Sequence, residues 1–116
     1  MARYFTVSEA NALLPTVRPL VERMVELRRE LRRRQESTGG ASANGGAFEP
    51  RLRAEIAACV GELERLGVQV KELDTGLVDF PSLRDGEEIL LCWRLGEEVI
   101  AWWHTPGGGF AGRQPL

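Results

Sequence analysis

The sequence predicts an α+β domain in which an N-terminal antiparallel helical hairpin, coiled-coil-like in its seams, packs on a small antiparallel β-sheet of three to four strands. Two segments with apolar residues at helical spacing come first, and alternating segments separated by turn residues follow. The length of 116 residues fits a single domain. Its predicted parts are a helical hairpin over 1–36 and 49–67, a flexible Gly-rich connector over 37–48, a sheet over 68–104 and a Gly-rich C-terminal tail over 105–116.

The first helical segment opens with a capping box, with Thr6 at the N-cap and Glu9 at the third helical position. Pro15 and Pro19 lack a backbone donor, so we expect a kink or a break there, with a longer helix that begins near Pro15 to Pro19 and runs to about Glu36. The apolar seam of that helix has spacings of 3, 4, 3 and 4, at Val17, Leu20, Met24, Leu27 and Leu31.

The second helix is predicted to start near Pro50 and to end at Gly67, a residue suited to the left-handed position after a helix. Its seam has spacings of 4, 3, 4 and 3, at Leu52, Ile56, Cys59, Leu63 and Leu66. Two matching seams joined by one connector predict an antiparallel hairpin.

The sheet is predicted from short runs of apolar residues between turn signals. A strand at Val68–Lys71 is followed by a turn at 74–76 and by a short strand, Leu77–Phe80, that Pro81 stops. After a turn at 84–86, the two clearest strands are Glu88–Arg94 and Glu98–Trp103, joined by a tight hairpin at 95–97.

That hairpin register places His104 near Glu87 and Ile89, and on the order of 10 Å or more from Cys92. The expectation excludes a Cys–His nucleophilic pair. Both faces of the hairpin are apolar, so the face away from the helices needs the N-terminal helix, the C-terminal tail or a second subunit as its cover. We favour the second subunit and therefore predict a homodimer.

Composition excludes several classes of protein. The net charge of −2 argues against nucleic-acid binding, and no apolar run is long enough to span a membrane. Cys59 and Cys92 form no C-x-x-C pair, and no secretory signal is visible, so the sequence predicts a cytoplasmic protein with reduced thiols. The motif G-x-G-x-x-G at 107–112 lacks the helix that a dinucleotide site needs, and we reject that interpretation.

His104, the only histidine, is either a residue at the edge of the core or a metal ligand that would need Asp79, Glu87 or Glu97 as an oxygen partner. Arg113 could hold a carboxylate or a phosphate, or it could pair with an acidic residue such as Asp79 and pin the tail. No metal ligand set or cofactor is assigned from the sequence, and no catalytic residue is identified.

The chain resembles a bacterial family designated domain of unknown function 2203, some of whose members are loosely labelled division initiation proteins. The resemblance lies in FTVSEANALLP (5–15), GVQVKEL (67–73), GLVDFP (76–81), LCWRLGE (91–97) and WHTPGGGFAGRQP (103–115). It implies no activity, but it implies where a shared site would lie. The candidate ligand-binding residues in these blocks are Asp79, Trp93, Glu97, His104, Phe110 and Arg113.

The sequence therefore predicts a small binding or scaffold protein that acts as a homodimer, with a protein partner as a further option and an enzyme as the less favoured reading. The alternative is a small-molecule or metal-binding protein, with enzymes among the options, whose site lies near His104 and Arg113.

Overall fold

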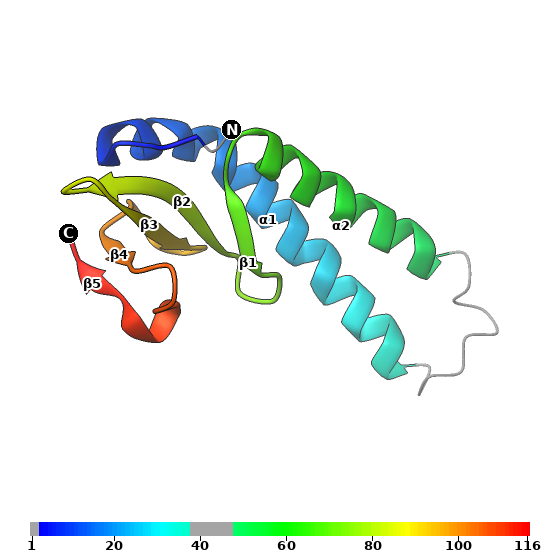
Figure 1. Cartoon of the computed structure of the whole chain (residues 1–116). Coiled ribbons are helices and arrows are strands. Elements are labelled where there is room, and N and C mark those ends of the chain that lie inside the picture. The colour runs from blue at the N-terminus through cyan, green and yellow to red at the C-terminus, as the bar shows by residue number, and fades with distance from the viewer. Residues whose placement is uncertain (1–2, 38–47) are drawn as a thin grey trace.

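Two helices pack on a five-stranded antiparallel sheet in the computed structural model, which describes residues 3–37 and 48–116. Most of the predicted connector, 37–48, lies outside the described residues. The molecule is elongated, with extents of 55 × 26 × 25 Å, because the helical hairpin projects past the sheet (Figure 1). The α+β class with an N-terminal helical hairpin is confirmed.

Helix α1 (Val7–Ser37) begins at the predicted capping box. The Thr6 backbone N–H donates to Glu9 Oε1 at 2.8 Å, and the Glu9 N–H donates to Thr6 Oγ1 at 3.0 Å. The hydrogen bond from the Thr6 backbone, followed by the one from its side chain, lowers the pKa of Glu9, because both favour the ionised carboxylate.

The lowered pKa of Glu9 predicts a pH-dependent contribution to stability. The contribution is complete above the pKa of an unfolded glutamate and is lost as the pH falls through the lowered pKa of the folded state. We expect the difference in urea midpoint between the wild type and Glu9→Gln to be largest at neutral pH and to shrink in acid. Urea denaturation over a pH series measures it, and a difference that stays constant with pH would contradict the assignment.

Of the kink or break expected at the prolines, the break does not occur, since α1 runs unbroken through Pro15 and Pro19. Both prolines are exposed, so the carbonyl groups that lose their helical donor lie on the side that faces water. The opposite side is held by Val17, Val21 and Met24, which are fully buried. The ribbon does change direction between the part of α1 above the sheet and the part beside α2 (Figure 1).

Helix α2 (Phe48–Arg65) packs on α1 through Ile56, Cys59 and Leu63. It ends in a Schellman motif, in which the Gly67 N–H donates to Glu64 O and the Val68 N–H donates to Leu63 O, both at 2.9 Å. Gly67 has φ of 92°, as its predicted place after the helix requires. The predicted antiparallel hairpin is therefore present.

The sheet has the strand order β1-β2-β3-β4-β5, with every neighbouring pair antiparallel. The sheet has five strands and not the predicted three to four, because the C-terminal tail supplies a fifth strand that pairs with β4. The predicted turn at 84–86 is present, with positive φ at Asp85 and Gly86. The strands are β1 (Gln69–Glu72), β2 (Leu77–Arg84), β3 (Glu87–Arg94), β4 (Trp102–His104) and β5 (Gln114–Pro115).

Pro81 does not end its strand, contrary to the prediction, because it lies where its missing N–H costs nothing. It pairs with Leu90 of β3, beyond the point at which β1 stops pairing with β2. The Pro81 carbonyl accepts the Phe5 N–H at 2.7 Å, so this side of β2 faces the N-terminal segment and not a strand.

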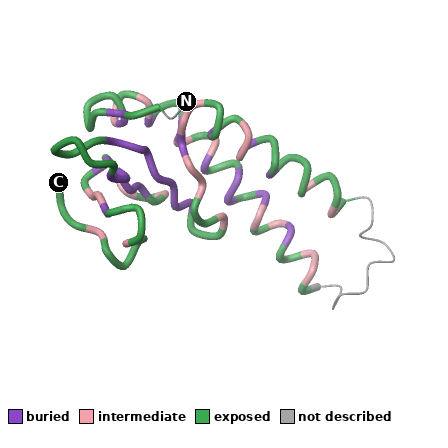
Figure 2. Tube along the Cα trace, in the orientation of Figure 1, coloured by how far each residue is buried: buried purple, intermediate pink, exposed green. Residues whose placement is uncertain are grey.

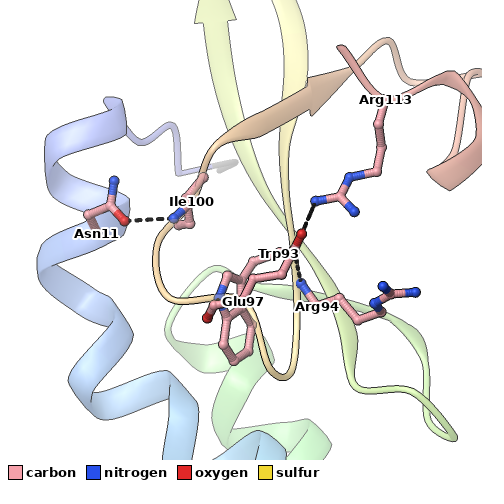
Figure 3. A network of polar contacts seen from close by, with 6 residues as sticks. All are labelled: Asn11, Trp93, Arg94, Glu97, Ile100 and Arg113. Atoms are coloured by element: carbon pink, nitrogen blue, oxygen red, sulfur yellow. Dashed lines mark hydrogen bonds and ion pairs between the residues drawn. The ribbon is translucent and has the colours of Figure 1, made fainter. Parts of the chain in front are cut away.

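The tight hairpin predicted at 95–97 is also wrong, since residues 95–101 form a loop and β4 starts only at Trp102. Side chains from elsewhere satisfy backbone groups that a hairpin would have paired. The Ile100 N–H donates to Asn11 Oδ1 at 2.8 Å, and Arg18 donates to the Glu98 carbonyl at 2.9 Å. Figure 3 shows Asn11 reaching this loop from α1.

The observed register pairs Leu90 with His104 and Cys92 with Trp102. His104 therefore does not lie opposite Glu87 or Ile89, and it shares a face of the sheet with Cys92. The other face, with Phe80, Leu91 and Trp93, belongs to the core that α1 covers. Burial is concentrated in β2, β3 and the inner side of α1 (Figure 2).

Candidate functional site

A buried polar cluster lies on the face of the sheet that points away from α1. Asp79 of β2 pairs with Cys92 of β3, and His104 ends the neighbouring strand β4. His104 Nε2 lies 2.9 Å from Asp79 Oδ2, and the two side chains are 3% and 2% exposed. The ligand atoms of Asp79, Cys92 and His104 all lie within 4.8 Å of one another.

The two ring nitrogens of His104 have different partners. Nδ1 lies 2.6 Å from the Thr105 carbonyl oxygen, which can only accept, so Nδ1 carries a hydrogen. The second ring nitrogen then either donates to an ionised Asp79 or accepts from a protonated one. In both cases one proton lies between Asp79 and His104, and the backbone of Thr105 orients the ring.

The Cys92 thiol is inert as a nucleophile in this environment. Burial raises its pKa to about 12, the negative charge of Asp79 adds to the increase, and the nearby Arg113 opposes it. Both nitrogens of His104 are engaged by other groups, so the imidazole is not placed as a base for the thiol. The predicted separation of 10 Å or more between Cys92 and His104 is wrong, since their ligand atoms lie within 4.8 Å of each other.

One oxygen of the cluster is left without a partner. Asp79 Oδ1 is buried and accepts no hydrogen bond from the described residues, although Asp79 is only 1% exposed. A buried carboxylate oxygen without a donor is costly, since most buried polar atoms are satisfied.

A second polar group holds the C-terminal segment, residues 105–116, against the 95–101 loop. Arg113 Nη2 donates to both carboxylate oxygens of Glu97, at 2.9 and 2.8 Å. Glu97 Oε1 also accepts the Arg94 N–H at 2.7 Å, and the Glu97 carbonyl accepts from the indole of Trp93 at 3.0 Å. Figure 3 shows Glu97 at the centre of this network, with Arg113 reaching it from the C-terminal segment.

The guanidinium group of Arg113 lies between aromatic rings. Its central carbon is 4.9 Å from the ring centroid of Trp102 and 4.7 Å from that of Phe110. The Phe110 ring also contacts a second guanidinium group, that of Arg94, whose central carbon is 4.9 Å from its centroid. The Arg113 side chain is only 9% exposed. Arginine stacked on aromatic rings and paired with a carboxylate is a strong anchor for a short segment.

The six sequence-predicted residues thus fall into two groups. Asp79 and His104 contact each other, while Trp93, Glu97, Phe110 and Arg113 form the anchor. Arg113 pairs with an acidic residue, as one of the two sequence interpretations expected, but that residue is Glu97 and not Asp79.

Sequence reasoning did not assign Cys92 and Trp102 to a site. The alternation of side chains along β3 and β4 places Cys92, Trp102 and His104 on one face of the sheet, but finding this from the sequence requires the correct pairing register of the two strands. The cluster is closed to solvent, since Asp79, Cys92 and His104 are each at most 2% exposed.

The fold and this cluster define a small α+β domain with a buried Asp–Cys–His group beneath its C-terminal segment. Residues 3–116 match the model of the family described as Uncharacterized conserved protein (DUF2203), and the chain belongs to that family, as the resemblance implied. No curated protein and no solved structure matches the chain. The family description assigns no function, so the activity has to be inferred from the site itself.

Proposed function

We propose that this protein binds a divalent metal ion of the zinc type through Asp79, Cys92 and His104. The observation that carries the proposal is that one oxygen, one sulfur and one nitrogen donor converge within 4.8 Å in a buried site. Mixed imidazole, thiolate and carboxylate ligands suit Zn²⁺ and its neighbours, whereas calcium and magnesium prefer oxygen alone.

The distances fit such an ion after small movements. Metal–ligand bonds of about 2.0–2.3 Å in a tetrahedral site place the donor atoms roughly 3.3–3.8 Å apart. Donors already within 4.8 Å need to shift by about 1 Å or little more, and the short Asp79–His104 contact has to open. The Thr105 carbonyl would hold Nδ1–H and leave Nε2 as the ligand, the outer-shell contact that metal-bound histidines commonly make.

The charges also fit a buried divalent ion. Binding removes the thiol proton of Cys92 and the proton shared by Asp79 and His104, which leaves a thiolate, a carboxylate and a neutral imidazole. Their combined charge cancels that of the ion, so the site becomes neutral, as a buried site favours. The unpartnered Asp79 Oδ1 would gain a cation nearby.

Native mass spectrometry of the purified protein, loaded with Zn²⁺ or Co²⁺ and desalted, tests the proposal. We expect one metal ion per chain in the wild type and in Cys59→Ala, and a loss of affinity of at least about 100-fold in Cys92→Ala. Cys59 is the matched control because it is also a free, buried cysteine, but it lies in α2, away from the cluster.

The cobalt form adds a spectroscopic criterion. A Cys92 thiolate bound to Co²⁺ gives a sulfur-to-metal charge-transfer band that Cys92→Ala lacks and Cys59→Ala keeps. Equal metal retention by both cysteine variants, or cobalt binding without that band, would overturn the proposed site.

A scaffold role as a cytoplasmic homodimer is our second proposal. An uncovered sheet face does not support it, because α1 and the C-terminal segment lie on opposite sides of β2 and β3 within one chain (Figure 1). The support that remains is the helical hairpin that projects past the sheet.

The two free thiols favour a reducing compartment, and no described helix has the length and apolar character to cross a membrane. The native mass spectra described above also report the number of subunits, and a monomeric mass would contradict the proposed homodimer.

A further inference from the structure

The metal site proposed above has no open route for an ion, because its three side chains are buried. Asp79, Cys92 and His104 are 1%, 0% and 2% exposed. The helices pack on the opposite face of the sheet, so among the described residues the cover on this side is the C-terminal segment (Figure 1). That segment follows His104 directly, and a Cβ placed on Gly108 would lie 3.6 Å from His104 Cβ.

The C-terminal segment is held at few points between its ends. Its strand β5 has only two residues, and the Leu116 N–H donates to the Ala101 carbonyl at 2.9 Å. Between His104 and β5, the segment has exposed glycines and the partly exposed Phe110. This stretch is held to the rest of the molecule by the ion pair between Arg113 and Glu97. The Arg113 side chain is mostly buried and also stacks on the Trp102 ring.

We propose that residues 105–113 form a strap over the Asp79–Cys92–His104 cluster, and that the Glu97–Arg113 pair is the latch that sets how often the strap opens. This inference concerns access to the proposed metal site, but the strap itself exists whether or not a metal binds. Between His104 and β5 the segment has one ion pair and its aromatic stacking as anchor, so breaking that anchor lets this part open locally while the rest of the fold stays intact. Opening exposes the donors without unfolding the helical hairpin.

Alkylation of Cys92 in metal-free protein measures the opening directly. In a Cys59→Ala background Cys92 is the only thiol, and iodoacetamide modifies it when its sulfur displaces iodide and its proton goes to the buffer. We expect Glu97→Gln and Arg113→Gln each to raise the labelling rate on the order of tenfold or more, since each breaks the latch. The double variant should label no faster than the faster single variant, because the two residues act through one pair.

Glu62→Gln is the matched control. It removes the same charge from a carboxylate that binds Arg65 in α2, where the side chains are 53% and 68% exposed. We expect no change in the Cys92 labelling rate in this variant.

Urea unfolding of each variant separates the latch from a general loss of stability. The proposal holds if labelling increases more than the equilibrium constant for global unfolding does. It fails if labelling follows global unfolding in every variant, or if Glu97→Gln labels at the wild-type rate. A second arm adds Zn²⁺: protection of Cys92 by zinc supports the metal site, and faster labelling without zinc protection would retain the strap and reject the metal site.

Discussion

Asp79→Ala is expected to lower the free energy of unfolding of the metal-free protein by about 3–5 kcal/mol, the usual loss when one partner of a buried ionisable pair is removed. The substitution leaves the second ring nitrogen of His104 buried without a partner. Urea denaturation followed by tryptophan fluorescence, in the presence of a chelator, measures the change.

The matched control is Asp74→Ala. Asp74 also bonds arginine, at 3.0 Å from Arg28 and 3.2 Å from Arg32, but it is 42% exposed. We expect this variant to lose less than about 1 kcal/mol. Similar losses in the two variants would show that burial does not decide the importance of Asp79.

A double-mutant cycle with His104→Leu separates the pair from its surroundings. The double variant Asp79→Ala/His104→Leu should be less destabilised than the sum of the single variants, because neither residue is then left alone in the core. Additive losses would mean that the 2.9 Å contact contributes no coupling.

Gly76→Ala is expected to lower the free energy of unfolding by about 2–5 kcal/mol, from backbone strain and overpacking together. Gly76 has φ of +70°, and an added Cβ would lie 2.7 Å from Val21 Cγ1 and 2.9 Å from Leu95 Cβ. Neither neighbour is the end of a long flexible side chain, so α1 or the 95–101 loop has to move.

Gly86→Ala is the control that isolates the overpacking. Gly86 has φ of +80°, close to that of Gly76, but a Cβ there meets nothing within 4 Å. We expect a loss of about 1–2 kcal/mol from the backbone alone. Urea denaturation of both variants decides the matter, and equal losses would contradict the close packing of Gly76 against α1.

The local signals in the sequence predicted the helical part well because they act over a few residues. The capping box at Thr6 and Glu9 and the glycine after α2 are formed as expected. The seam of α1 faces the core, with Leu20 partly buried and its other residues buried, because helical spacing places those residues on one side whatever the rest of the chain does.

The same local signals gave wrong predictions where a segment far away in the chain binds the backbone. Pro81 looked like the end of a strand, but the N-terminal segment takes the place of a neighbouring strand at that point. The 95–101 loop looked like part of a hairpin because turn residues at 95–97 separate two apolar runs. Asn11 and Arg18 of α1 bind the backbone of this loop, so its residues do not pair as a strand. They lie roughly ninety and eighty residues earlier in the chain than the groups they bind.

By itself, the sequence determined the α+β class and the helical hairpin, and it singled out Asp79 and His104 but not Cys92. Only the tertiary structure decided which of them meet, because a register shift in an antiparallel sheet moves side chains along the sheet or to its other face. The pairing of Leu90 with His104 brings the imidazole to Asp79 and Cys92, and it leaves Glu97 as the partner of Arg113.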